Sequence, residues 1–274
     1  MNNINTMKKI LACCFLIVLM ASAAVAGTLA YENWTAVQYA EKFSGKLEIK
    51  LVQWQRIYQD GEMVLTGMAR ENRELIPLVG SAQYNGSNFD KYGMPVAEGY
   101  VDHIVQVKNT GTPGVDADAY VRVVVAIPAA LDDANDAGKN ALHWNLGNRF
   151  MPDGDFTASN STNPHFSDIV RKFAAKDTVE GTECNIYTFT YNTPLQPGET
   201  TPAAAFVGFY LDRDVDIVDG HITLDGKDTG FTSDSVKIYV KAQAVQAYGF
   251  GSAAAAFEAV NAADNPWAAG QAEG

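Results

Sequence analysis

The feature that most limits the possible folds is a series of short apolar or alternating runs, each ending near Gly, Pro or Asn. Residues 120–127, YVRVVVAI, are almost continuously apolar and rich in β-branched side chains, which is typical of a central strand, and Pro128 ends the run. Residues 101–108, VDHIVQVK, alternate with the period of a half-buried strand, and the turn sequence NTG follows. Similar runs cover residues 46–51, 184–191, 205–211 and 236–245. We therefore predict an all-β protein with the architecture of a sandwich or barrel.

Two stretches depart from the strand pattern. Residues 131–139, LDDANDAGK, are polar and predict a loop or a short helix. Residues 252–262 are rich in alanine. Ser252 is a suitable N-cap, and Phe257 and Val260 have the spacing of one helix face. We therefore predict a short C-terminal helix that packs against the sheets.

The N-terminus has the pattern of a secretory signal. Lys8 and Lys9 are the only charged residues among the first 30, and an apolar run over residues 10–26 follows them. This run of about 17 residues is at the short limit of a membrane span. Small residues end it, which favours cleavage over retention as an anchor. Two cuts fit the small-x-small rule, one after Ala26 and one after Ala30.

The predicted organisation is a signal peptide over residues 1–30, a single β domain over 31–264 and a flexible tail over 265–274. Removal of the leader leaves 18 basic and 32 acidic residues, a net charge of −14. Such a surface repels nucleic acid and anionic lipid, so we expect neither as a partner. Cys184 is the one cysteine beyond the leader, which excludes an intrachain disulfide and predicts a fold that depends on its hydrophobic core.

The sequence offers no catalytic motif that we would defend. The histidines do not form an H-E-x-x-H pair, and no G-x-S-x-G sequence occurs. Cys184 lies in an alternating strand pattern, where a small buried hydrophobe is a commoner role than a nucleophile. We therefore expect no catalytic residue and no enzymatic activity. The histidines concerned are His103, His143, His165 and His221.

Three carboxylates form the strongest candidate metal site. Asp212, Asp214 and Asp216 stand at every second position, so on a strand they would share one face. Their mutual repulsion would be relieved by Ca²⁺, which prefers oxygen ligands. The glycine and distal glutamate of an EF-hand are not in place, and a solvated strand face is the alternative. A second acidic cluster contains Asp132, Asp133 and Asp136, for which we expect only solvation.

The segment after the leader, residues 31–43 (YENWTAVQYAEKF), has four aromatic side chains and few turn residues. It can form an ordinary first strand or helix. A free, extended and aromatic end can instead add itself to the edge of a neighbouring sheet, because the backbone groups of both molecules are then satisfied. A head-to-tail contact of this kind that does not close produces a filament. The residues expected in such an assembly strand are Tyr31, Trp34, Val37, Tyr39 and Phe43.

Several motifs together resemble the TasA/camelysin family. The leader ends in Gly-Thr-Leu-Ala-Tyr at residues 27–31, similar to leaders cut by the SipW-type signal peptidase. VKNTG followed by DAYVRVVVAIP, within residues 107–128, looks like the paired strands of that family. TPLQPGETTP at residues 193–202 and KAQAVQAYGF at residues 241–250 resemble its later segments. The chain departs from the family after Tyr31, where Phe-Thr-Asp is usual and Glu-Asn-Trp-Thr stands here.

The resemblance implies a jelly-roll-like β-sandwich that is secreted to the extracellular matrix or cell surface. It implies cleavage between Ala30 and Tyr31 by a SipW-type peptidase, and assembly into biofilm fibres by donated N-terminal strands. The expected partners are therefore other copies of the chain, joined head to tail, and a further matrix protein.

Two other functions are compatible with the sequence. Some members of the family carry a metalloprotease label, so a secreted camelysin-like metalloendopeptidase is the first alternative. The second is a monomeric cell-surface binding module, for which an exposed Trp54 and an exposed Trp144 would form a carbohydrate platform.

Overall fold

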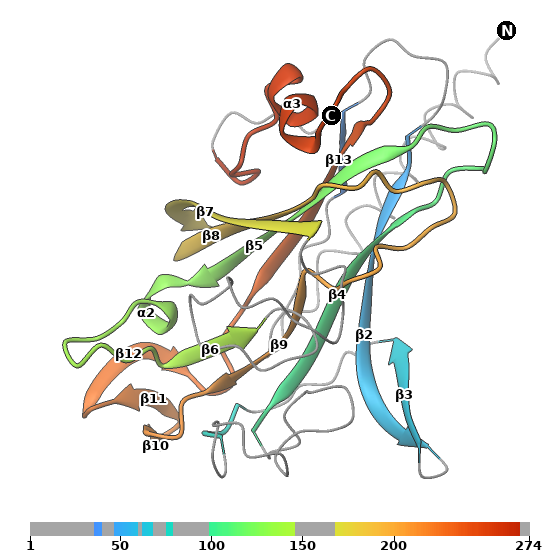
Figure 1. Ribbon diagram of the computed structural model, residues 1–274. Coiled ribbons are helices and arrows are strands. Elements are labelled where there is room, and N and C mark those ends of the chain that lie inside the picture. The colour runs from blue at the N-terminus through green and yellow to red at the C-terminus, as the bar shows by residue number, and fades with distance from the viewer. Residues whose placement is uncertain are drawn as a thin grey trace, which may run out of the picture.

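The structure, a computed structural model, describes residues 36–39, 47–59, 62–67, 75–78, 99–145 and 168–268. These residues form mainly strands, together with two short helices, α2 (Ala129–Asp132) and α3 (Ala253–Ala259). Two five-stranded sheets lie face to face, and a small three-stranded sheet extends them at one end (Figure 1). The predicted all-β sandwich with a short C-terminal helix is therefore confirmed.

The first sheet has the order β1-β13-β5-β8-β7. Its strands are β1 (Ala36–Tyr39), β13 (Tyr239–Gln246), β5 (Ala119–Pro128), β8 (Thr182–Tyr191) and β7 (Ile169–Val179). The pairs β13–β5, β5–β8 and β8–β7 are antiparallel, whereas β1 runs parallel to β13. Within the described chain, β1 and β7 are the two edges of this sheet.

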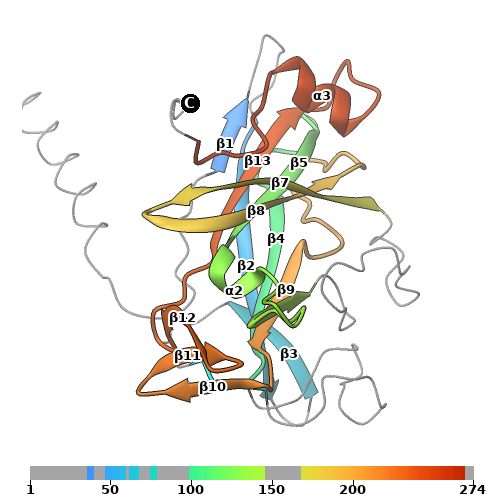
Figure 2. The same ribbon diagram turned by 90° about the vertical axis from the view of Figure 1, so that its left-hand side faces the viewer.

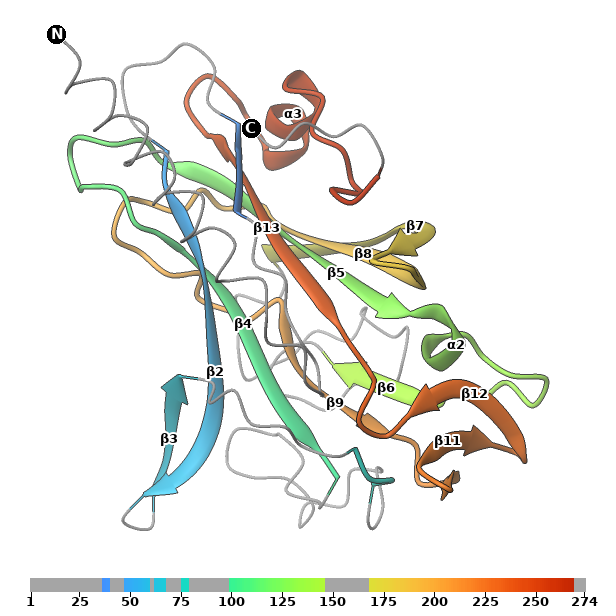
Figure 3. The same cartoon turned by 180° about the vertical axis from the view of Figure 1, so that it is seen from behind.

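The second sheet has the order β3-β2-β4-β9-β6, and all of its pairs are antiparallel. Its strands are β3 (Glu62–Gly67), β2 (Ile49–Gln59), β4 (Val101–Asn109), β9 (Phe206–Leu211) and β6 (Leu142–Asn145). The small sheet contains β10 (Val215–Val218), β11 (His221–Leu224) and β12 (Lys227–Thr232). Seen from behind, it lies beyond the end of β13 that is remote from α3 (Figure 3).

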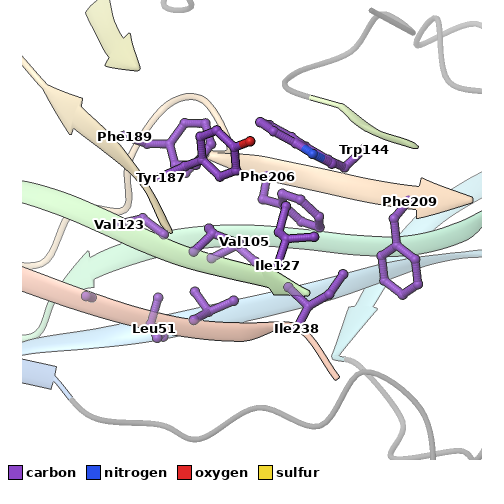
Figure 4. Close-up of a cluster of buried hydrophobic side chains, with 14 of the residues drawn as sticks. Leu51, Val105, Val123, Ile127, Trp144, Tyr187, Phe189, Phe206, Phe209 and Ile238 are labelled. Atoms are coloured by element: carbon purple, nitrogen blue, oxygen red, sulfur yellow. The ribbon is translucent and has the colours of Figure 1, made fainter. Parts of the chain in front are cut away.

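The core fills the space between the two five-stranded sheets. Val123 and Ile127 of β5 meet Val105 of β4 and the rings of Phe206 and Phe209 on β9 (Figure 4). These side chains are almost completely buried. Those of β5 come from every second position of the strand, whereas Phe206 and Phe209 are three residues apart at a register shift between β4 and β9. The alternation read from the sequence therefore places one face of each sheet in a common core.

Strand β5 is buried on both faces, which explains why its sequence is continuously apolar. Val123 and Val125 face the core between the sheets, whereas Val124 and Ala126 belong to a separate cluster on the outer face. That outer cluster also includes Trp267 from the C-terminal segment. A strand covered on two sides has no solvent-facing positions for polar residues, so alternation disappears.

The C-terminal helix forms as its sequence predicts. The Ser252 side chain accepts a hydrogen bond from the backbone N–H of Ala255, at 3.2 Å, and so caps α3. Phe257 is buried against Tyr120 and Val245. The predicted polar stretch after Ile127 is a single helical turn, α2, followed by a loop. Residues 1–35, which include the predicted leader, lie outside the described residues.

The strands that the sequence patterns missed are connected by two-residue turns. Asp219 and Gly220 have φ values of 51° and 83° between β10 and β11, and Asp225 and Gly226 have 51° and 74° between β11 and β12. Positive φ at both central positions is the geometry that Asp-Gly pairs favour in tight hairpins. Glu180 and Gly181 repeat it between β7 and β8, with values of 47° and 87°. The Asp-Gly pairs were thus a usable hairpin signal.

Candidate assembly interface

The described part of the predicted assembly strand is β1, at the edge of the first sheet. Its register on β13 pairs Ala36 with Ala242 and Tyr39 with Val245. Val37, a second predicted assembly residue, pairs with Gln243. The other predicted assembly residues, Tyr31, Trp34 and Phe43, lie outside the described residues, as does the predicted cleavage site at Ala30. Residues 36–39 of the segment therefore form a strand, and that strand pairs with β13 of its own chain.

We call the edge of β13 that does not pair with β5 the seat of β1. The other edge of β13 pairs antiparallel with β5 over eight residues. Ala242 and Ala244 of β13 point into the core, whereas Gln243 points to the outer face and is fully buried there. Without β1, the N–H and C=O groups of β13 that now face it would be unpaired, as on any edge strand. The contact between β1 and β13 is therefore a backbone ladder.

A buried arginine joins β13 to the strand beside it. The Arg122 side chain on β5 is nearly buried, and its Nε donates to Oε1 of Gln243 at 2.7 Å. Its guanidinium also contacts Asp264, 2.5 Å from Nη1, and lies 4.4 Å from the centre of the Phe257 ring. Partial burial favours protonated Asp264, but hydrogen bonds from Lys172 and Arg122 outweigh it and lower the pKa of this carboxyl below 3.8.

The three carboxylates predicted to share a strand face do not do so, and that prediction is wrong. Asp212 follows the end of β9, Asp214 lies in the turn before β10, and Asp216 lies on β10. The turn breaks the alternation, and the Asp212 and Asp214 side chains take separate partners. Asp212 Oδ2 is 2.7 Å from Nε2 of His143, and Asp214 accepts from Nζ of Lys139 at 2.8 Å.

This ion pairing changes the electrostatics of the predicted calcium ligands. The hydrogen bond from Lys139 lowers the pKa of Asp214. The Lys139 ammonium therefore already offsets part of the negative charge that a cation would neutralise. Among the described residues, no three His, Cys, Asp or Glu side chains are grouped so that they could hold a metal ion.

The second acidic cluster is not simply solvated, because Asp132 is buried. Its carboxylate accepts hydrogen bonds from Nε1 of Trp144 at 2.7 Å, the hydroxyl of Tyr187 at 2.6 Å and Nδ2 of Asn185 at 2.8 Å. Burial, reinforced by the neighbouring Asp132 charge, raises the pKa of Tyr187. Trp144 itself is only 2% exposed, so the expectation that it forms an exposed glycan platform is wrong. Its ring instead packs on Phe206 and Tyr187.

Cys184 and His103 are core residues. Cys184 on β8 is fully buried, as predicted, and burial raises the pKa of its thiol to about 12. His103 on β4 is fully buried between the rings of Phe206 and Phe209, at centroid distances of 5.5 and 6.3 Å. Neither position has the exposure that a catalytic nucleophile or base requires for contact with a substrate.

Neither helix in the described ranges is long and apolar enough to cross a membrane. Comparisons of the chain with protein-family models, with curated proteins and with solved structures found no match.

Proposed function

We propose that this protein is a secreted structural subunit of extracellular matrix or cell-surface fibres, whose copies are joined head to tail by donated N-terminal strands. The observation that supports this proposal is the position of β1. It is a four-residue strand at the edge of a sheet, and it is the one strand in the described chain that runs parallel to its neighbour.

The pairing of β1 with β13 can be exchanged between copies. Main-chain hydrogen bonds form this pairing. These hydrogen bonds are the same whether the strand comes from the same chain or from a second copy. A copy that gives its β1 to one neighbour leaves its own β13 open for the next. The contact is heterologous and does not close on itself, so repetition of it produces a filament.

Protein concentration sets the balance between the closed monomer and the fibre. Within one chain, the pairing of β1 with β13 is intramolecular, and such a contact has an effective concentration on the order of millimolar. Strand exchange is therefore favoured where exported protein accumulates at a surface. The acidic composition, with a net charge of −12 for the full chain, keeps dilute copies apart and is consistent with a monomer that assembles late.

Deletion of residues 31–43 tests the proposal. We expect a monomer with an intact β-sheet circular dichroism spectrum and no fibres in negative-stain electron micrographs. A matched control deletes residues 269–274 at the other end of the chain and should leave fibre formation unchanged. Fibres of normal length and number from the 31–43 deletion would show that strand donation is not the mechanism.

A further inference from the structure

The C-terminal segment after α3 crosses the outer face of the first sheet, beside the seat of β1. We name residues 262–268 the C-terminal strap. Figure 2 shows this part of the chain lying across β13. The strap accepts two hydrogen bonds from β13: Nε2 of Gln243 donates to the carbonyl of Ala263 at 3.1 Å, and Nζ of Lys241 donates to the carbonyl of Pro266 at 3.2 Å. Gln243 lies within the β1 register, and Lys241 directly precedes it.

The strap also reaches the other strands of the sheet. The Nη2 group of Arg122 on β5 donates to the carbonyl of Ala263 at 3.0 Å. Asp264 binds Lys172 of β7, and Nδ2 of Asn265 donates to Asp177 of β7 at 2.7 Å. The strap thus fixes β13 relative to the far edge of the sheet. It also extends the packed chain beyond residue 264, where the sequence placed the end of the domain.

Trp267 closes the outer face with an apolar contact. Its ring packs on the cluster that contains Val124, Cys184 and Tyr239, and Nζ of Lys241 lies 5.2 Å from its centre. The strap is therefore attached to the sheet at two places, by hydrogen bonds from the buried Arg122 guanidinium and by apolar packing of the Trp267 ring. Both attachments lie on the face of β13, so they leave its edge accessible to a strand.

We propose that the C-terminal strap is part of the acceptor site, where it keeps β13 straight while its edge is open to the β1 strand of a second copy. The proposal rests on the proposed function. In a copy that has donated β1, β13 keeps its backbone hydrogen bonds to β5 but has no strand on its other edge. Edge strands with few remaining contacts fray, and a frayed strand cannot template the addition of another. The strap supplies contacts on the face of β13, and these remain when β1 has left its edge. It is consequently required to accept a strand and not to donate one.

The test uses a strap variant that combines Asp264→Ala with Trp267→Ala. We expect it to sediment with at least tenfold less polymer than the wild-type protein. Asp136→Ala is the matched control, since its side chain is 90% exposed and binds Lys227 in another part of the fold. This control should polymerise normally.

Mixing separates acceptance from donation. The strap variant keeps β1, and the protein lacking residues 31–43 keeps an intact acceptor. Each alone should remain a monomer, whereas their mixture should form a 1:1 dimer in size-exclusion chromatography with light scattering. A strap variant that polymerises as well as the wild-type protein would overturn the inference, and so would a mixture in which no dimer forms.

Two controls keep these outcomes interpretable. If the double variant does not fold, Asp264→Asn keeps the size of the side chain and should still slow polymerisation. The rate at which Cys184 reacts with a thiol reagent reports whether the strap still packs on the sheet. We expect this rate to be at least tenfold higher in the strap variant than in the wild-type protein. Normal polymerisation of the 31–43 deletion would refute the proposed function, whereas normal polymerisation of the strap variant alone would refute only the inference.

Discussion

Replacement of Asp132 by alanine should destabilise the sandwich more than any comparable change at a surface carboxylate. The side chain accepts hydrogen bonds from three buried donors, on Trp144, Tyr187 and Asn185. Together they join α2, β6 and β8. Alanine leaves all three donors without this acceptor.

The size of the effect follows from the number of donors. A buried donor that loses its partner costs about 1–3 kcal/mol. The adjoining Asp133 is exposed, so water can reach part of the space that alanine vacates. We therefore take the lower end for each donor, which gives a loss of about 3 kcal/mol in the free energy of unfolding. For a domain of this size, that loss lowers the melting temperature by roughly 6–12 °C.

Urea denaturation followed by tryptophan fluorescence measures the loss, with unchanged circular dichroism as the check on the fold. Asp132→Asn, which keeps an acceptor oxygen without the charge, should fall between the alanine variant and the wild-type protein. Asp136→Ala is the control and should unfold at the wild-type midpoint. A loss below about 1 kcal/mol in Asp132→Ala would refute the assignment of these hydrogen bonds as a stabilising network.

Three further predictions concern other parts of the chain. A thiol reagent at pH 8 should not modify Cys184 in the native protein, because burial raises the pKa of the thiol to about 12. Labelling should appear only when the protein is denatured, and rapid labelling of the native protein would contradict the burial of Cys184. The folded pKa of Asp264 is lowered from 3.8, so its ion pairs stabilise the protein above pH 3.8 and lose this effect as pH falls through the folded pKa. The difference in urea midpoint between the wild-type protein and Asp264→Asn should therefore shrink below pH 3.8. A difference that stays constant with pH would count against the ion pairs. Mass spectrometry of the exported protein should give a chain that starts at Tyr31, and a start at Gly27 would move the cut to Ala26.

The fold was largely predictable from local sequence, because half-buried strands carry a simple period. The runs at residues 101–108 and 184–191 correspond to β4 and β8 within a residue or two. Strand β7 was harder to recognise. It is an edge strand with mixed exposure on both faces, so its sequence, IVRKFAAKDTV, has no clear alternation. Asp212 and Asp214 were misplaced because their two-residue spacing continued the pattern of β9 through what is in fact a turn.

The site was less predictable, because its parts come from opposite ends of the chain. An aromatic N-terminal segment could be recognised as a candidate strand, but its register on β13 depends on residues about two hundred positions away. The buried role of Asp132 was equally hidden. Its neighbours Asp133 and Asp136 are exposed, and only the arrival of Trp144 and Tyr187 from other strands makes Asp132 an interior residue. Polar networks of this kind have no local sequence signature.

The pairing of β1 with β13 has a consequence for the order of folding. The strand leaves the ribosome about two hundred residues before the strand on which it lies. Closing so long a loop is slow and entropically costly, so β1 docks after the rest of the sandwich has formed. Every newly folded molecule therefore passes through a period in which its strand and its seat are both vacant. Crowded refolding should join molecules during that period, and dilute refolding should close each one on itself.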